Sequence, residues 1–351
     1  MSRLFCILLL AITNTVCACS SFLLNYNGRH IVGKNYDWNI EIGRVLINKR
    51  GVCKTAFKVT HPISWKSKYG SVSFNQYGQE FPIGGMNEKG LVIEALWLNE
   101  TVYPPATGDL PEIDNIQWIQ FQLDNSASIT DVINNDKKVQ IHPLSSTAIH
   151  FFIADQQGKS LIIEAVDGAL HHYLPDSTNP GVLTNDPYDK SLRLMQKCKE
   201  FGGNLEIPDG QGSVSRFIRA AVQLKNRNEK VNDDPVQSSF RILKSVQLRF
   251  LTKWSITYDL DNRIVYFKSA SSNTVKSVGL NDLNFNCGEP VQFVNIQINK
   301  KGDILKYFRD YKIQDNHELL EKSISKTDFL KYSGKLLLQE LSEYKNTLQC
   351  N

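Results

Sequence analysis

Residues 19–38, "CSSFLLNYNGRHIVGKNYDW", contain two apolar runs on either side of an Asn27-Gly28 dipeptide. An Asn-Gly pair between such runs is the strongest short-range signal for a β-hairpin with a tight turn. We therefore predict two antiparallel strands here, the second returning beside the first. This pairing brings Asp37, at the end of the second strand, close to Cys19, at the start of the first.

The residues before Cys19 have the three-part form of a secretory signal peptide. A basic residue precedes an apolar run over residues 4–12, and Val16 and Ala18 stand at positions −3 and −1 before the cleavage point. The apolar run is too short for a transmembrane helix, which needs about 20 apolar residues. We predict that residues 1–18 are removed and that the mature chain is secreted or periplasmic, without stable membrane insertion.

Export would leave an odd number of cysteines in an oxidising compartment, so at least one thiol is free or pairs with another molecule. Up to two disulfides, in three connectivities, could join Cys53, Cys198, Cys287 and Cys350. No cysteine pair has CxxC spacing, and the adjacent His171 and His172 point to opposite faces of a predicted strand. We therefore predict no metal site.

Cleavage before Cys19 would give this residue both a thiol and a new α-amino group. Their unperturbed pKa values are about 8.5 and about 8, so the amine can act as a base for its own side chain. A carboxylate is needed to orient the amine, and the predicted hairpin supplies Asp37. Two other roles for Cys19 stay open: "VCAC" also fits a lipoprotein signal, in which a lipid would block both groups, and Cys19 could be a disulfide partner.

The rest of the chain alternates predicted hairpins and helices, which is typical of one α+β domain with helices outside stacked sheets. The predicted hairpins cover residues 43–59, 81–99, 146–174 and 252–270, and the predicted helices cover residues 111–125, 128–135, 215–226 and 235–248. The 351 residues carry a formal charge of +4, and the basic residues are spread along the chain. This pattern argues against nucleic acid as a partner and against a polybasic membrane patch.

The C-terminal segment, residues 301–351, differs from the domain at residues 19–300. We predict an amphipathic helix capped near Ser325 or Thr327, and its apolar positions are Phe329, Leu330, Leu336, Leu337, Leu341, Tyr344 and Leu348. Docking on the body of the same chain is favoured over binding to a partner or a membrane.

Several motifs occur in an order that resembles the choloylglycine hydrolases, the family that includes bile salt hydrolases and penicillin V acylases. They are "CSSFLL…IVGKNYDW", "NEKGLVIEALWL" at 87–98, "GVLTNDP" at 181–187 and "SVSRFIRAA" at 213–221. The resemblance covers roughly residues 19–290. It implies a four-layer αββα N-terminal-nucleophile hydrolase fold and a cysteine amidase that cleaves linear amide C–N bonds without a metal or an organic cofactor.

The resemblance also assigns residues to roles. It implies Cys19 as the nucleophile, Asp37 as the partner of its amine, and Asn185 as a side-chain donor to the oxyanion. Arg216 would hold the charge network around them. We expect a small-molecule N-acyl amide as the substrate, and a homo-oligomer is left open.

Substrate-binding roles are predicted for Lys34, Trp38 and Trp97. The alternatives are a solvated strand edge for Lys34 and packing in the core for the two tryptophans. Many relatives have asparagine in place of Trp97, and its side chain gives a second contact to the oxyanion. Here an indole N–H or a backbone amide would have to give that contact. Many relatives also have arginine in place of Lys34. The implied substrates are phenoxyacetyl-type penicillins, N-acyl homoserine lactones, other N-acyl amino compounds and conjugated bile acids. Conjugated bile acids rank last because Trp97 and Lys34 depart from the pattern of the bile salt hydrolases. The alternatives are a lipid-anchored or secreted binding protein without catalysis, and an N-acyltransferase.

Overall fold

The computed structural model describes residues 18–26, 28–226, 234–330 and 334–350. Two large sheets carry the fold. The strands of the first are β1 (Ser20–Tyr26), β2 (Arg29–Asp37), β14 (Val182–Leu183), β15 (Thr252–Asp259), β16 (Ile264–Ser269), β17 (Lys276–Gly279) and β19 (Gly302–Asp303). The strands of the second are β3 (Arg44–Asn48), β6 (Ser71–Asn75), β7 (Pro82–Asn87), β8 (Val92–Trp97), β11 (Ile149–Ala154), β12 (Ser160–Val166), β13 (Ala169–Tyr173), β18 (Gln292–Asn295) and β20 (Arg309–Asp310).

The remaining elements are short strands and helices. The strands are β4 (Val52–Thr55), β5 (Ser64–Lys66), β9 (Glu112–Ile113), β10 (Gln140–Ile141) and β21 (Gln349–Cys350). The α-helices are α1 (Asn115–Asn125), α2 (Ile129–Asp136), α3 (Tyr188–Met195), α4 (Ser213–Lys225), α5 (Pro235–Ser245), α6 (Ile313–Ile324) and α7 (Gly334–Glu343). The 3₁₀ turns are η1 (Lys199–Phe201), η2 (Leu280–Asp282), η3 (Leu305–Tyr307) and η4 (Tyr344–Thr347).

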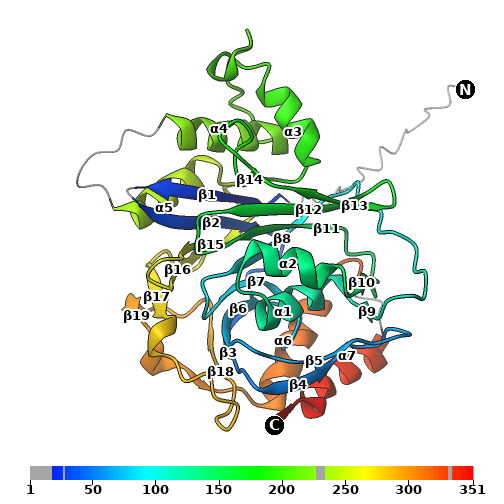
Figure 1. Ribbon diagram of the computed structural model, residues 1–351. Coiled ribbons are helices and arrows are strands. Elements are labelled where there is room, and N and C mark those ends of the chain that lie inside the picture. The colour runs from blue at the N-terminus through cyan, green and yellow to red at the C-terminus, as the bar shows by residue number, and fades with distance from the viewer. Residues whose placement is uncertain (1–17, 27, 227–233, 331–333, 351) are drawn as a thin grey trace, which may run out of the picture.

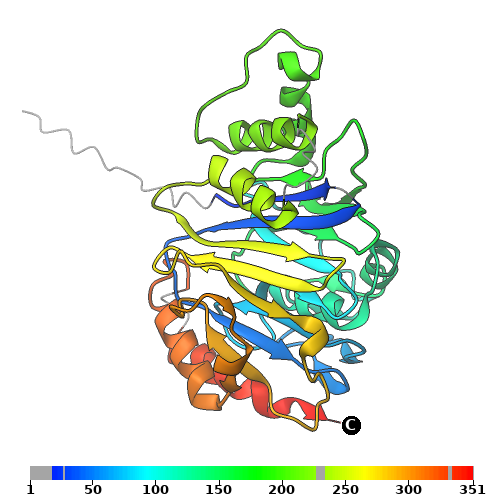
Figure 2. The same cartoon turned by 90° about the vertical axis from the view of Figure 1, so that its left-hand side faces the viewer.

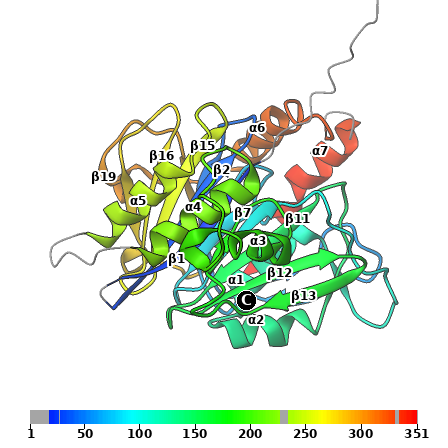
Figure 3. The same ribbon diagram turned by 90° about the horizontal axis from the view of Figure 1, so that it is seen from above.

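The two sheets stack face to face, and helices cover both outer faces (Figure 1). The seven-stranded sheet has the order β14-β1-β2-β15-β16-β17-β19, and the nine-stranded sheet has the order β13-β12-β11-β8-β7-β6-β3-β18-β20. Helices α4 and α5 pack on β1, β2 and β15, with α3 against α4, while α1 packs on β7 and β8 with α2 beside it. Seen from above, α4 and α5 lie over the first sheet and α3 lies beside α4 (Figure 3). The predicted four-layer αββα architecture is therefore confirmed.

The predicted first hairpin is present. Strands β1 and β2 pair in antiparallel register from Ser20 opposite Asn35 to Tyr26 opposite Arg29. Gly28 takes the left-handed φ of 73° that a tight turn requires. Both strands are buried over most of their length because helices cover one face of their sheet and the second sheet covers the other.

Three more predicted hairpins are confirmed, as β7–β8, β11–β12 and β15–β16, but the hairpin over residues 43–59 is wrong. β3 pairs with β6 and β18, whereas β4 pairs with β5 and β21. At the predicted turn, the Arg50 and Gly51 N–H groups donate to Phe285 and Ser67 instead of across a hairpin. A glycine turn shows where the chain reverses, but not which strand it meets next.

The C-terminal segment docks on the body of the same chain, as favoured. β19 extends the first sheet and β20 extends the second, so residue 300 is not a structural break. The helix boundary was wrong: α6 ends at Ile324, and α7 begins at Gly334. Thr327 does not cap a helix start, because its hydroxyl donates to Ser323 O at the end of α6. Figure 2 shows both helices at the far end of the sandwich from α3 and α4.

One disulfide joins Cys287 to Cys350 and ties the last described strand, β21, to the body. Cys198, by contrast, is a buried free thiol. Among the described residues, no helix is long and apolar enough to cross a membrane. Residues 1–17 of the predicted leader lie outside the described part of the chain, so its cleavage stays a prediction.

Candidate active site

The β1–β2 hairpin brings Cys19 and Asp37 together. Cys19 is only 3% exposed, and its Sγ lies 4.0 Å from the Asp37 carbonyl oxygen, to which the thiol donates. Ala18 still precedes Cys19 in the described chain, so the Cys19 nitrogen is a peptide nitrogen. It stands in for the α-amino group that cleavage would create at this place.

Asp37 has one satisfied and one unsatisfied carboxylate oxygen. Its Oδ1 accepts a hydrogen bond from the Thr252 hydroxyl, because Thr252 stands opposite Asp37 in the β2–β15 pairing. Its Oδ2 is buried, has no hydrogen-bond partner among the described residues, and lies 3.9 Å from Arg216 Nη1. A buried carboxylate oxygen without a donor is unfavourable, so Oδ2 is placed to accept another hydrogen bond. Sequence reasoning missed Thr252, although it opens the predicted hairpin at residues 252–270.

Arg216, on α4, connects the predicted catalytic residues. Its Nη1 donates to Cys19 O and Ser20 Oγ, both at 2.6 Å, and its Nη2 donates to Asn185 Oδ1 at 2.9 Å. Its Nε donates to Gln211 O at 3.2 Å. The planar guanidinium therefore holds the nucleophile's own carbonyl and the Asn185 amide at once, which an ammonium group could not do in the same geometry.

The Asn185 side chain is oriented from both ends. Because its Oδ1 faces Arg216, its Nδ2 points the other way and donates to Trp97 O at 2.7 Å. One N–H of this amide is thereby used, and the second is available to another acceptor. The Trp97 indole N–H, one of the two predicted sources of a second oxyanion contact, already donates to Asn99 Oδ1 at 2.7 Å. The backbone amide is the alternative that stays open.

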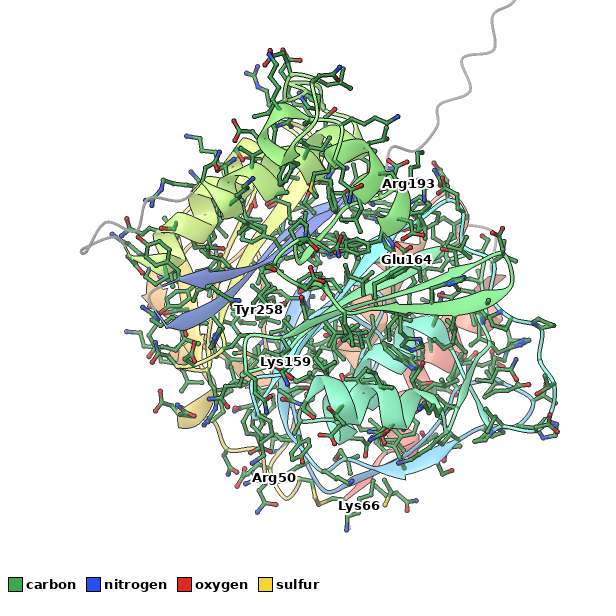
Figure 4. All side chains as sticks on the ribbon, turned by 45° about the horizontal axis from the view of Figure 1, so that its top comes forward. Arg50, Lys66, Lys159, Glu164, Arg193 and Tyr258 are labelled. Carbon is green, nitrogen blue, oxygen red and sulfur yellow. A yellow bond between two sulfur atoms is a disulfide. The ribbon has the colours of Figure 1, made fainter. Side chains whose placement is uncertain are left out.

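Lys34 does not occupy the substrate-facing position that we predicted, nor a solvated strand edge. Its side chain is 0% exposed, and its Nζ donates to Ala95 O at 2.6 Å and lies 3.6 Å from Glu94 Oε2. Glu94 also accepts from the hydroxyl of Tyr258, on β15 (Figure 4). Lys34 therefore points between the two sheets and lines neither of the cavities described below. Its contacts are with β8 of the second sheet.

Burial dominates the electrostatics of the site. Burial raises the pKa of the Cys19 thiol, and Asp37 adds to the rise, while Lys34 and Arg216 oppose it. Burial also raises the pKa of Asp37 to about 7, against the lowering effects of Arg216, Thr252 and Lys34. In the uncleaved chain Cys19 is therefore a protonated thiol at neutral pH, and a base is needed to activate it.

Two cavities meet at an aromatic partition. The first, of about 390 Å³, is mainly apolar and includes Cys19 in its wall. The second, of about 500 Å³, is more polar and includes Asn185 and Arg216. The residues that line both are Trp38, Trp97 and Phe329. Their rings are in contact, with centroids 6.0 Å apart for Trp38 and Trp97 and 5.7 Å apart for Trp97 and Phe329.

The two predicted tryptophans line both cavities, and the structure adds Phe329 from the C-terminal segment. Their substrate-binding role stays a prediction. Sequence reasoning placed Phe329 on an apolar helix face but had no signal for its position at the site. The structure brings Cys19, Asp37, Asn185 and Arg216 into one cluster, and their catalytic roles stay predictions.

Comparison with known proteins agrees with this geometry. The pattern of the linear amide C–N hydrolases, choloylglycine hydrolase family, matches residues 19–293. This chain belongs to the choloylglycine hydrolase family. It is therefore a hydrolase acting on linear amide C–N bonds.

Two curated members of the choloylglycine hydrolase family show how far the likeness extends. Penicillin V acylase of Pectobacterium atrosepticum is 29% identical over 267 residues, which are 64% of this chain and 70% of that protein. The bile salt hydrolase/transferase of Lactiplantibacillus plantarum is 24% identical over 305 residues, which are 74% of this chain and 92% of that protein.

Solved structures show the same fold. Penicillin V acylase from Agrobacterium tumefaciens superposes with a TM-score of 0.71 at 23% identity, over 84% of this chain and 98% of that one. A variant of the conjugated bile acid hydrolase from Clostridium perfringens gives a TM-score of 0.67 at 21% identity, over 82% of this chain and 99% of that one. The αββα sandwich of this chain is thus the N-terminal-nucleophile hydrolase fold.

Proposed function

We propose that this protein is an exported cysteine amidase that hydrolyses N-acyl amides through an acyl-thioester on Cys19. The observation that carries the proposal is Asp37 Oδ2, a buried carboxylate oxygen to which no group of the described residues donates a hydrogen bond. Cleavage before Cys19 would create a cationic amine beside it, and that amine would supply the donor. Burial of Cys19 also favours a nucleophile over a lipid anchor, because a lipidated cysteine has to reach the membrane surface.

The reaction needs no group beyond this cluster. The α-amino group of mature Cys19 takes the thiol proton, and Sγ then bonds to the acyl carbon. Asn185 Nδ2 donates its second N–H to the oxyanion that forms. The C–N bond breaks as the α-ammonium returns the proton to the leaving amine. Water then gives a proton to the α-amine, its oxygen bonds to the acyl carbon, the C–S bond breaks and the sulfur recovers the proton.

The cavities suggest where the two halves of the substrate lie. The apolar cavity beside Cys19 suits the acyl group, and the polar cavity beside Asn185 and Arg216 suits the amine. Phenoxyacetyl penicillins, N-acyl homoserine lactones and other N-acyl amino compounds are the proposed substrates, with conjugated bile acids ranked last. Transfer of the acyl group to an amine instead of water would use the same residues, and product analysis distinguishes the two.

Replacing Asn185 by alanine is expected to lower kcat by about 10²–10³-fold, because one preorganised donor to the oxyanion is lost. Steady-state kinetics on an N-acyl amide measures this effect. Asn99→Ala is the matched control, since Asn99 also lines the polar cavity and its side chain accepts a hydrogen bond from the Trp97 indole N–H. We expect Asn99→Ala to change kcat by less than about threefold. An equal loss of kcat in Asn185→Ala and Asn99→Ala would contradict the role of Asn185 as a donor to the oxyanion.

Intact-mass analysis of the protein purified after export is expected to show a chain that begins at Cys19 with a free amine. The full proposal requires this state, because the base does not exist until residues 1–18 are removed. An uncleaved chain with full activity would contradict the proposed base. A diacylglyceryl adduct on Cys19 would instead support the lipid-anchored binding protein.

A further inference from the structure

We propose that the C-terminal extension, residues 301–351, sets the length of the acyl chain that this enzyme accepts. In this proposal α7 closes the far end of the apolar cavity and acts as a fixed stop. The inference rests on the proposed function in one respect, namely that the apolar cavity holds the acyl group. It assigns a specificity role to a segment that lies beyond the family match at residues 19–293.

The extension contributes directly to the wall of the apolar cavity. Its four lining residues are Phe329, Leu330, Leu337 and Leu341. Leu337 and Leu341 lie one turn apart on α7 and so present the same face of the helix. Leu336, the residue before Leu337, points away from the cavity and is 66% exposed. One side of α7 therefore lines the cavity, and another side faces solvent.

The cavity has two ends with different neighbours. Cys19 and Trp38 belong to the core between the sheets, where Trp97 and Phe329 pack against them. Leu337 and Leu341 belong to a separate apolar cluster with Phe57 and Phe81. Cys19 and the two leucines of α7 thus belong to different parts of the cavity wall, and in this proposal an acyl chain bound to Cys19 extends toward α7.

Several contacts hold α7 in place against the body. The Tyr344 hydroxyl donates to Thr55 O at 2.6 Å and accepts from Gln117 Nε2 at 2.8 Å. Lys58, which also lines the cavity, forms an ion pair with Glu340 on α7. Beyond the helix, the disulfide between Cys287 and Cys350 closes the segment onto the body. These contacts attach α7 to the rest of the chain, so the helix forms a fixed part of the cavity wall.

The lining identifies the class of acyl group. The side chains that α7 places in the cavity wall, Leu337 and Leu341, are aliphatic and pack with Phe57 and Phe81, so this end suits the apolar terminus of a chain without polar substituents. The cavity volume of about 390 Å³ holds an unbranched chain of roughly a dozen carbons, taking about 30 Å³ a group, which is the space of one water molecule in the liquid. A medium-length fatty acyl group is thus the proposed fit.

The test compares neighbouring residues of one helix. Leu337→Trp fills the far end of the cavity, Leu337→Ala extends it, and Leu336→Trp and Leu336→Ala are the matched controls on the solvent face. Each mature variant is assayed on butanoyl, octanoyl, dodecanoyl and hexadecanoyl amides of one amine. Thermal melts identify any variant that does not fold.

We expect Leu337→Trp to lower the dodecanoyl-to-butanoyl ratio of kcat/KM by about ten- to hundredfold, since a pocket discriminates one or a few methylenes by this much. Leu337→Ala should shift the preferred chain toward hexadecanoyl, and both Leu336 variants should keep the wild-type ratio. Turnover with a ratio that Leu337 does not alter would overturn the inference and leave the proposed function standing.

A binding measurement separates the two proposals if turnover fails. Calorimetric titration of dodecanoate into the same variants reports on the cavity without catalysis. Weaker binding of dodecanoate by Leu337→Trp than by Leu336→Trp, in a chain that hydrolyses none of the amides, would support the extension as a stop and contradict the amidase. Equal dodecanoate binding by both variants would overturn the inference whatever the activity.

Discussion

Cys19→Ala is expected to lower kcat by at least about 10⁴-fold, because the variant retains the base but has no nucleophile. Cys19→Ser should also lose nearly all turnover, since a hydroxyl loses its proton far less readily than a thiol. Hydrolysis of an N-acyl amide by the mature variants measures the effect, and mass spectrometry of the wild type during turnover should detect an acyl adduct on Cys19.

The matched control is Cys198→Ser, which removes the other described thiol that is both buried and free. Cys198 follows α3 and its Sγ lies 3.9 Å from Leu194 O, outside both cavities. We expect this variant to keep wild-type kcat, with a melting temperature close to that of Cys19→Ser. Unchanged turnover in Cys19→Ala would refute the thioester mechanism.

Arg216→Met is expected to lower the free energy of unfolding by about 3–5 kcal/mol and to remove most activity. Its loss leaves the acceptors on Cys19, Ser20 and Asn185 buried without their donor, and it leaves Asp37 without its nearby cation. Denaturant unfolding measures the stability, and steady-state kinetics measures the activity.

The same substitution should move the acid limb of the kcat/KM profile to higher pH. Arg216 lowers the pKa of Asp37, so its removal raises that pKa, and Asp37 must be ionised to hold the α-ammonium of Cys19. Arg219→Met is the control on the same helix, where the guanidinium donates to the backbone carbonyls of Pro208 and Gly210. There we expect a loss of about 1 kcal/mol and an unshifted profile, so an equal shift in both variants would contradict the role of Arg216.

Local sequence signals predicted much of the fold, since most of the hairpins and the helices α1, α2, α4 and α5 form where expected. These elements depend on turn residues and on apolar periodicity, which act over a few residues. The hairpin at Arg50-Gly51 failed because its two strands pair with other strands instead of with each other, β3 with β6 and β18 and β4 with β5 and β21. The same limit applied to the disulfide, where composition allowed three connectivities and folding placed Cys287 beside Cys350.

The sequence by itself determined the centre of the site: Cys19 and Asp37 meet because a two-residue turn requires the second strand to return beside the first. The ordered motifs added Asn185 and Arg216, which long-range packing then brought to the same place. Only the tertiary structure decided that Lys34 points between the sheets and that Thr252 contacts Asp37. It alone also placed Phe329 and α7 in the cavity wall. An apolar face in the sequence shows that a helix is buried, but what covers it depends on how distant segments pack.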